Sequence, residues 1–153
     1  MAIYLFMNIG TFAVILSMRK EGRYVENISD LAGLNKSHPM MALAMLIFMF
    51  SMAGIPPLAG FFSKWYVFLA AIDAGLYGLA VIGVLASVVG AFYYIRIIKV
   101  MYFDDSDQAL DSGMSADMRV IMGATAVVTL LFFIIPAPVV DLAGLAAETL
   151  FIK

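Results

Sequence analysis

Long apolar runs alternate with short polar stretches along this chain of 153 residues. A helix rises about 1.5 Å per residue, so about 20 apolar residues cross a bilayer core of roughly 30 Å. The pattern predicts an all-α polytopic membrane helix bundle in which residues 1–153 form a single membrane region. Four transmembrane segments are expected, and the second is discontinuous: 2–18, 40–54 continued by 58–73, 76–103, and 119–135.

The last residues predict a different kind of element. Asp141 and Glu148 are seven residues apart and so share one face of a helix. Residues 139–153 are therefore expected to form an amphipathic tail at the far membrane surface. At the other end, the apolar run after Met1 has no basic leader and no cleavage signal. We expect the chain to be part of a longer membrane protein.

The second segment is interrupted by two consecutive prolines, Pro56 and Pro57, which are flanked by Gly54 and Gly60. Proline lacks a backbone N–H and its ring clashes with the preceding turn, so a proline pair breaks a helix. In lipid, each backbone group that the break frees costs several kcal/mol unless protein or water pairs with it. The pattern therefore predicts a discontinuous helix next to a protein-lined or water-filled cavity.

The distribution of Lys and Arg distinguishes a discontinuous crossing from a hairpin of two short helices. With a single crossing, loops 19–39 and 96–119 share one side and hold seven basic residues (four plus three), against Lys153 on the other side. A hairpin would divide the basic residues five against three. Since cytoplasmic loops are enriched in Lys and Arg, we expect both loops to be cytoplasmic and the C-terminus to lie on the outer side.

Composition supports the membrane assignment and excludes several classes of site. Hydrophobic residues make up 64% of the chain and charged residues 13%, whereas about 25% charged residues is usual in soluble domains. The chain has no cysteine, which excludes disulfides, thiolate zinc sites and cysteine-bound iron–sulfur clusters. A net charge of −2 argues against nucleic acid as a partner. We expect neither a cofactor nor a metal in this chain.

Lys64 is the principal candidate site residue, because no other charged residue lies between His38 and Asp73. Ionisable residues within membrane segments often mark ion or proton pathways. Desolvation disfavours the charged form of a lysine, so Lys64 is predicted to transfer protons. Alternatively, it snorkels to the surface or pairs with a carboxylate on another helix. Asn8 and His38 are secondary polar candidates, for which a structural role is the favoured interpretation.

Three stretches resemble a known family: Asp30–Leu34, Ser51–Tyr66 (SMAGIPPLAGFFSKWY) and Tyr93–Arg96. Together they resemble the C-terminal part of the subunit N family of bacterial NADH-quinone oxidoreductase (respiratory complex I), within the antiporter-like superfamily. In that family, Lys64 matches a lysine of the second discontinuous helix, on the path of protons toward the outer side.

The resemblance implies a proton-translocating membrane subunit, in a translocase that couples electron transfer from NADH to quinone to proton pumping. It implies no redox centre in this chain, with NADH, FMN, iron–sulfur clusters and quinone bound by partner subunits. The implied partners are other complex I membrane subunits and the lipid bilayer, and the implied location is the bacterial inner membrane. Two alternatives remain open, a cation/proton antiporter subunit of the Mrp type and a non-conducting scaffold fragment.

Overall fold

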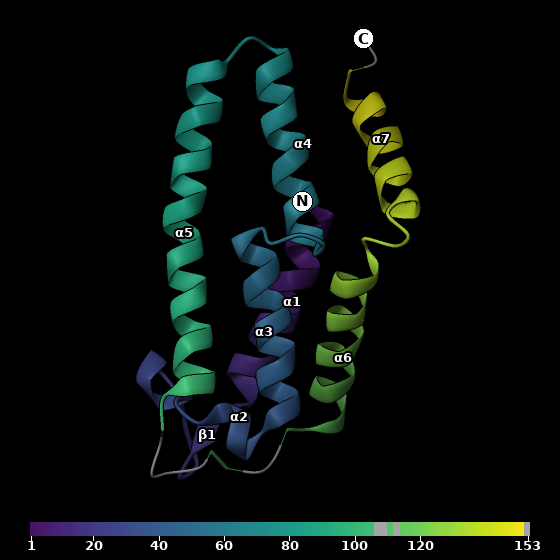
Figure 1. The fold of residues 1–153 in the computed structure, drawn as a ribbon. Helices are drawn as coiled ribbons and strands as arrows, with labels where there is room; N and C mark the ends of the chain where they lie inside the picture. The colour runs from purple at the N-terminus through teal and green to yellow at the C-terminus, as the bar shows by residue number, and fades with distance from the viewer. Residues whose placement is uncertain (106–109, 112–113, 152–153) are drawn as a thin grey trace.

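The computed structural model describes residues 1–105, 110–111 and 114–151. Parts of the predicted loop 96–119 and the end of the predicted tail 139–153 therefore lie outside the described residues. The helices, shown in Figure 1, are α1 (Ala2–Ser17), α2 (Leu34–Ser37), α3 (Pro39–Ala53), α4 (Ala59–Asp73), α5 (Tyr77–Phe103), α6 (Ala116–Leu131) and α7 (Ala137–Phe151), with a 3₁₀ turn η1 at Ile28–Leu31.

The helices run roughly along one common direction (Figure 1). Helix α1 packs against α6 and α3, and α3 packs against α5. Helix α4 continues in the direction of α3 beyond a short irregular stretch, and α5 returns beside both of them (Figure 1). The chain between α3 and α4 therefore lies about halfway along the length of α5.

The core lies where α1, α3, α6 and the second half of α5 meet. Phe48 and Met45 from α3, Val14 from α1 and Met101 from α5 are at most 2% exposed. A Cβ atom at Gly10 would lie 2.2 Å from the ring of Phe48, so this glycine lets α1 and α3 approach closely. Close contacts of this kind stabilise the helix packing through van der Waals attraction, which is small for each atom pair and large in sum.

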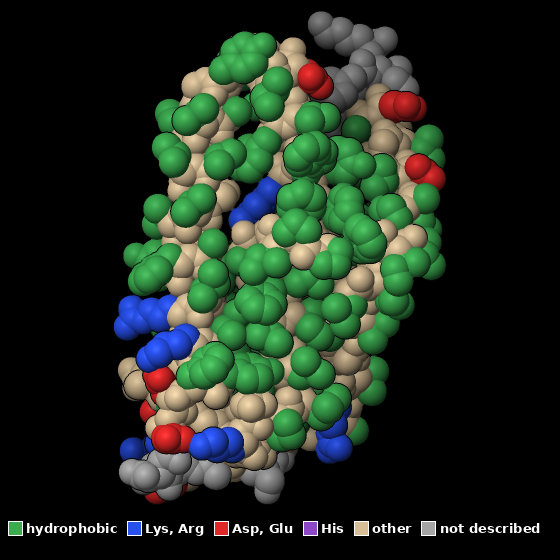
Figure 2. Space-filling view, viewed as in Figure 1, with side chains coloured by type: hydrophobic (Ala, Val, Ile, Leu, Met, Phe, Trp, Pro, Cys, Tyr) green, Lys and Arg blue, Asp and Glu red, His purple; other side chains and the backbone are tan. Residues whose placement is uncertain are grey.

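Much of the remaining surface is apolar. On α5, the side chains of Ile82, Leu85 and Val88 are each more than 60% exposed. Figure 2 shows hydrophobic side chains over the middle of one face, while Lys and Arg gather toward its lower end. By length and composition alone, α5 is the one helix among the described residues long and apolar enough to cross a membrane; α1 and α3 are shorter apolar helices.

The structure adds one element that the all-α prediction lacks, a short antiparallel hairpin of β1 (Arg19–Lys20) and β2 (Arg23–Tyr24). Glu21 and Gly22 between the strands have φ values of 53° and 76°, as in the tight turns that favour glycine. The carboxylate of Asp111 accepts hydrogen bonds from the N–H groups of Glu21 and Gly22, at 3.2 and 2.8 Å. Strands of two residues are too short to produce an alternating sequence pattern.

The last two helices also differ from the expected ranges. Helix α6 occupies Ala116–Leu131 rather than 119–135. After Leu131 the chain forms turns, because the residue before Pro136 is disfavoured in a helical conformation. Helix α7 begins at Ala137, and Pro138 is tolerated in its first turn because the N–H groups there have no partner within the helix.

Candidate functional site

The end of α3 forms the first half of the irregular stretch. Gly54 has a φ of 85°, a conformation that glycine adopts without steric cost. Its N–H lies 3.0 Å from the carbonyl oxygen of Ser51, and the N–H of Ile55 donates to the carbonyl of Phe50 at 3.1 Å. This pair of bonds is the glycine-dependent helix end known as the Schellman motif. It pairs carbonyl groups in the last turn of α3 that have no partner within the helix.

Pro56 and Pro57 form the turn that follows, and the peptide bond between them is cis. The N–H of Leu58 donates to the carbonyl of Ile55 across this turn at 3.1 Å. Helix α4 begins at the next residue, Ala59. Because neither proline has an N–H group, the turn leaves fewer backbone donors to be paired.

Lys64 lies in the second turn of α4 and reaches back to the end of α3. Its Nζ donates a hydrogen bond to the carbonyl oxygen of Ala53 at 3.0 Å. A Cβ atom at Gly54 would lie 3.0 Å from the Lys64 Cδ, so the glycine also makes room for the lysine side chain. The carbonyl end of a helix carries partial negative charge, which stabilises a nearby ammonium. The contact thus joins the two helices across the proline turn.

A second polar contact holds α4 against α3. The N–H of Gly60 donates to the hydroxyl oxygen of Ser51 at 2.9 Å, and that hydroxyl lies 2.9 Å from the sulfur of Met7 on α1. The Ser51 side chain is fully buried. A Cβ atom at Gly60 would lie 1.9 Å from the Ser51 carbonyl oxygen. Gly60 therefore permits a backbone approach that no other residue allows.

Lys64 lines three neighbouring cavities of about 730, 340 and 210 Å³. All three are also lined by Ser87 on α5, and the first two by Ser63. The 340 Å³ cavity extends to Tyr94. The walls of these cavities are mostly apolar, and water molecules held in them need the few polar groups as partners. Hydroxyl groups are thus available near the ammonium for a hydrogen-bonded water chain.

Neither of the secondary candidates, Asn8 and His38, lines the three cavities around Lys64. The side-chain amide of Asn8 donates to the carbonyl of Tyr4 at 2.8 Å, within α1. His38 precedes α3 at the end opposite the proline turn, about 22 Å from it by the length of a 15-residue helix. The structure therefore brings Lys64, Gly54 and Gly60 together but leaves His38 outside their site.

Sequence reasoning did not single out Ser51, Ser63 or Ser87 as polar neighbours of Lys64. Ser51 and Ser63 lie inside the stretch that carries the family resemblance, and Ser87 lies in a run of small residues on α5. The sequence shows these serines only as hydroxyl-bearing residues among other small residues. Small residues of this kind are equally expected where two membrane helices pack closely. Among the described residues, no group of three or more His, Cys, Asp or Glu side chains could hold a metal ion.

Comparison with known proteins assigns the chain to a family. Residues 1–90 match the family model described as "NADH:quinone oxidoreductase/Mrp antiporter, TM". The chain belongs to this family. The matched region contains α1, α3, α4 and the first half of α5, and so includes the proline turn, Lys64 and Ser87.

Relatives within the family carry a more specific name. The chain is 65% identical over 150 residues to NADH-quinone oxidoreductase subunit N of Rhodospirillum rubrum, with 98% of this chain and 31% of that protein covered. It is 59% identical over 151 residues to the subunit N of Paramagnetospirillum magneticum, with 99% and 31% covered. The chain thus spans about a third of the length of these curated relatives.

A solved structure has the same fold. A chain of "Respiratory complex I from Thermus thermophilus with bound Aureothin" aligns with a TM-score of 0.73 at 28% identity. The alignment covers 88% of this chain and 31% of that chain. The membership in a transmembrane antiporter family, together with the apolar helix α5 of bilayer length, makes this a membrane protein. The short hairpin is its one non-helical element among the described residues.

Proposed function

We propose that this chain is the C-terminal part of a proton-translocating membrane subunit of NADH:quinone oxidoreductase, and that Lys64 accepts and releases the transported proton. The names of the relatives support the enzyme. The observation that carries the role of Lys64 is its position across the proline turn, bonded to the carbonyl of Ala53 and facing cavities lined by hydroxyl groups.

To accept and release a proton, a side chain must be stabilised by its surroundings in both the charged and the neutral form. As an ammonium, Lys64 is stabilised by the carbonyl end of α3 and donates to Ala53. As a neutral amine, it accepts a hydrogen bond from water in the cavity that it shares with Ser63 and Ser87. Gly54, Pro56, Pro57 and Gly60 hold the two helix ends in place; Gly60 also lines this cavity, and Gly54 lines the neighbouring one of about 210 Å³.

We propose a topology of four crossings. Helices α1 and α5 each cross once, and α3 with α4 forms one discontinuous crossing, since both run in the same direction (Figure 1). Helix α6, which like α1 has 16 residues and is about 24 Å long, forms the fourth crossing together with the turns and the start of α7. The remainder of the tail then reaches the outer surface.

The orientation follows from charge. Loops 19–39 and 96–119 carry seven of the nine basic residues, which supports a cytoplasmic position for both loops and an outer position for the C-terminus. The bacterial relatives and the transmembrane family model support a location in the bacterial inner membrane. We propose that electrons bypass this chain, with NADH, FMN, iron–sulfur clusters and quinone bound by partner subunits, and that its neighbours are other membrane subunits of the complex.

Two alternatives predict different behaviour of Lys64. An Mrp-type cation/proton antiporter subunit is named in the description of the family model, and it would exchange a cation for protons without electron transfer. A scaffold would use Lys64 in a structural ion pair. The ion pairs found among the described residues involve Lys20, Lys36 and Lys99, not Lys64, so such a pair would need a partner outside them.

The test replaces Lys64 in the assembled complex and measures the ratio of protons pumped to electrons transferred in proteoliposomes. We expect Lys64→Ala to abolish or sharply reduce this ratio. Lys64→Arg keeps a cation and a donor, but arginine releases its proton far less readily, so it retains at most part of the pumping. The control is Lys99→Gln, which removes an exposed cation paired with Asp104 and leaves the ratio unchanged.

The outcomes separate the hypotheses. A wild-type ratio in Lys64→Ala refutes the proton-transfer role. Full pumping in Lys64→Arg together with none in Lys64→Ala indicates a structural cation, as the scaffold hypothesis requires. Sodium-dependent proton exchange by the isolated membrane subunits, lost in Lys64→Ala and independent of NADH, would favour the Mrp-type antiporter.

A further inference from the structure

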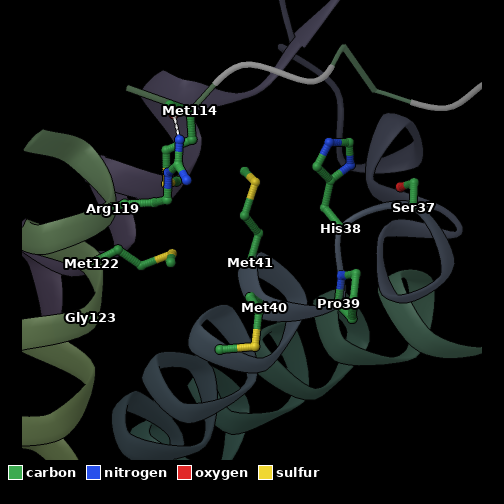
Figure 3. A pocket seen from close by; sticks show the side chains of 9 residues that line it. All are labelled: Ser37, His38, Pro39, Met40, Met41, Met114, Arg119, Met122 and Gly123. Atoms are coloured by element: carbon green, nitrogen blue, oxygen red, sulfur yellow. Dashed lines mark hydrogen bonds between the residues drawn. The ribbon is translucent and has the colours of Figure 1, made fainter. Parts of the chain in front are cut away.

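A pocket of about 560 Å³ lies between the start of α3 and the start of α6, well away from Lys64. Figure 3 shows Arg119 on one wall, His38 on the other and methionines between them. None of these side chains takes part in the proposed proton site. We call it the α3–α6 pocket, and define it by Ser37–Met41, Met114, Arg119 and Met122–Gly123.

The polar groups of the α3–α6 pocket suit an anion. The guanidinium of Arg119 donates to the carbonyl of Met114 at 3.1 Å, which engages one nitrogen of a group that has five N–H donors. Arg119 is absent from the ion pairs found among the described residues.

His38 gives a second indication of a ligand. Its Nδ1 is enclosed and has no hydrogen-bond partner within the described part of the chain. An enclosed polar atom without a partner costs about 1–3 kcal/mol. Rotation of the ring toward an acceptor in the pocket would remove that cost. His38 and Arg119 thus offer donors from opposite walls (Figure 3).

The rest of the pocket is apolar and adaptable. Met40, Met41 and Met122 line it (Figure 3), and methionine side chains adjust readily to flexible apolar ligands. At Gly123, an added Cβ would meet no atom within 4 Å, so the backbone of α6 leaves open space. The pocket therefore combines a cationic mouth with room for a hydrocarbon chain.

The α3–α6 pocket lies at a depth where lipid headgroups are expected. The pocket lies at the end of the molecule where loops 19–39 and 96–119 carry their basic residues, the end at which Lys and Arg gather in Figure 2. Basic pockets between membrane helices at this boundary attract anionic lipids. We propose that the α3–α6 pocket binds an anionic phospholipid, with the phosphate at Arg119 and an acyl chain along the methionines. This site is independent of the proton-transfer role of Lys64.

The test places the assembled complex, containing the full chain, in nanodiscs with a trace of phosphatidylglycerol that carries a photoreactive acyl chain. Cross-linked residues are then mapped by peptide mass spectrometry. We expect cross-links on the methionine wall, competed by unlabelled phosphatidylglycerol at least about five-fold better than by phosphatidylcholine. Arg119→Gln should lower the yield several-fold. The matched control is Arg23→Gln, which removes an exposed arginine of β2, outside the pocket, and should not change the yield.

A second variant tests the pocket without changing charge. Gly123→Leu projects a side chain into the open space and should lower the yield even where Arg119→Gln fails to assemble. Absence of cross-links in the pocket, equal competition by phosphatidylcholine, or an unchanged yield in both variants would overturn the proposal. Competition by inorganic phosphate alone at an equal concentration would overturn it too, since a free anion would then occupy the site.

Discussion

The contact between Gly60 and Ser51 gives the sharpest prediction about how the site is held together. In Gly60→Ala, the new Cβ would lie 1.9 Å from the Ser51 carbonyl oxygen, 2.6 Å from its carbon and 3.1 Å from the hydroxyl oxygen. The first two atoms belong to the backbone of α3, so no side-chain rotation can relieve the clash. The two helices must separate by more than 1 Å, on the order of the shortfall from ordinary van der Waals contact.

The energetic consequence can be estimated from three contributions. Overpacking costs about 1–3 kcal/mol, and loss of the hydrogen bond from the Gly60 N–H to the buried Ser51 hydroxyl costs about 1–3 kcal/mol. Alanine is favoured over glycine in a helix by about 1 kcal/mol, which offsets part of this. A net loss of roughly 1–5 kcal/mol follows, and each kcal/mol lowers Tm by about 2–4 °C for a chain of this size.

The assay compares thermal unfolding of the purified protein with proton pumping in the assembled complex. Gly60→Ala should lower both Tm and the proton-to-electron ratio, because the separation of α3 from α4 moves Lys64 away from Ala53. The control is Gly78→Ala on α5, where an added Cβ meets no atom within 4 Å, and which should leave both unchanged or slightly raise Tm. Wild-type Tm and pumping in Gly60→Ala would refute the close approach of the two helices.

Three further predictions follow from neighbouring contacts. Ser51→Ala should cost about 1–3 kcal/mol, seen as a lower Tm, because it leaves a buried amide at the start of α4 unpaired; an unchanged Tm contradicts this. Gly54→Ala should impair pumping, because φ is 85° and the Cβ meets the lysine side chain, whereas Gly22→Ala strains a similar φ of 76° in open space and should leave pumping intact. The hydrogen bond and the charge of Lys36 lower the pKa of Asp105. The pair therefore stabilises the folded state at pH values above the ordinary carboxyl pKa, and this stabilisation is lost as the pH falls through the lowered pKa of Asp105. Lys36→Gln should raise that pKa in a carboxyl NMR titration, and an unchanged titration would exclude the pair.

The class of the protein and the position of the helix break could be predicted from the sequence because they depend on local chemistry. An apolar run of bilayer length predicts a membrane helix because its residues avoid water. The pair Pro56–Pro57 predicts a helix break because proline restricts the backbone of its immediate neighbours. The break residues Gly54 and Gly60 were likewise identified from their place beside the prolines. The structure gives each of them a specific task, a left-handed helix end and a close helix contact.

The partners of these residues could not be predicted, because they depend on how the chain turns between the helices. The bond from Lys64 to Ala53 joins residues 11 positions apart, a spacing with no meaning within one helix. The contact of Ser51 with Met7 joins residues 44 positions apart. The hairpin at Arg19–Tyr24 was missed for another reason, since two-residue strands leave only the Glu21–Gly22 turn as a signal.

Among the described residues, Lys64 is paired with a carbonyl rather than with a carboxylate, and this bears on the proposed mechanism. If an aspartate or glutamate paired with the ammonium, release of the proton would leave a partly buried anion without a counter-ion, at a cost of several kcal/mol. A neutral carbonyl leaves only an unpaired acceptor, which a water molecule in the adjoining cavity can satisfy. The free energies of the charged and neutral forms therefore differ less than in a buried ion pair. A carboxylate introduced beside the lysine by Ser87→Asp should favour the charged form and slow proton release, with electron transfer measured in parallel. Unaltered pumping in that variant would show that the partner of Lys64 does not govern proton release.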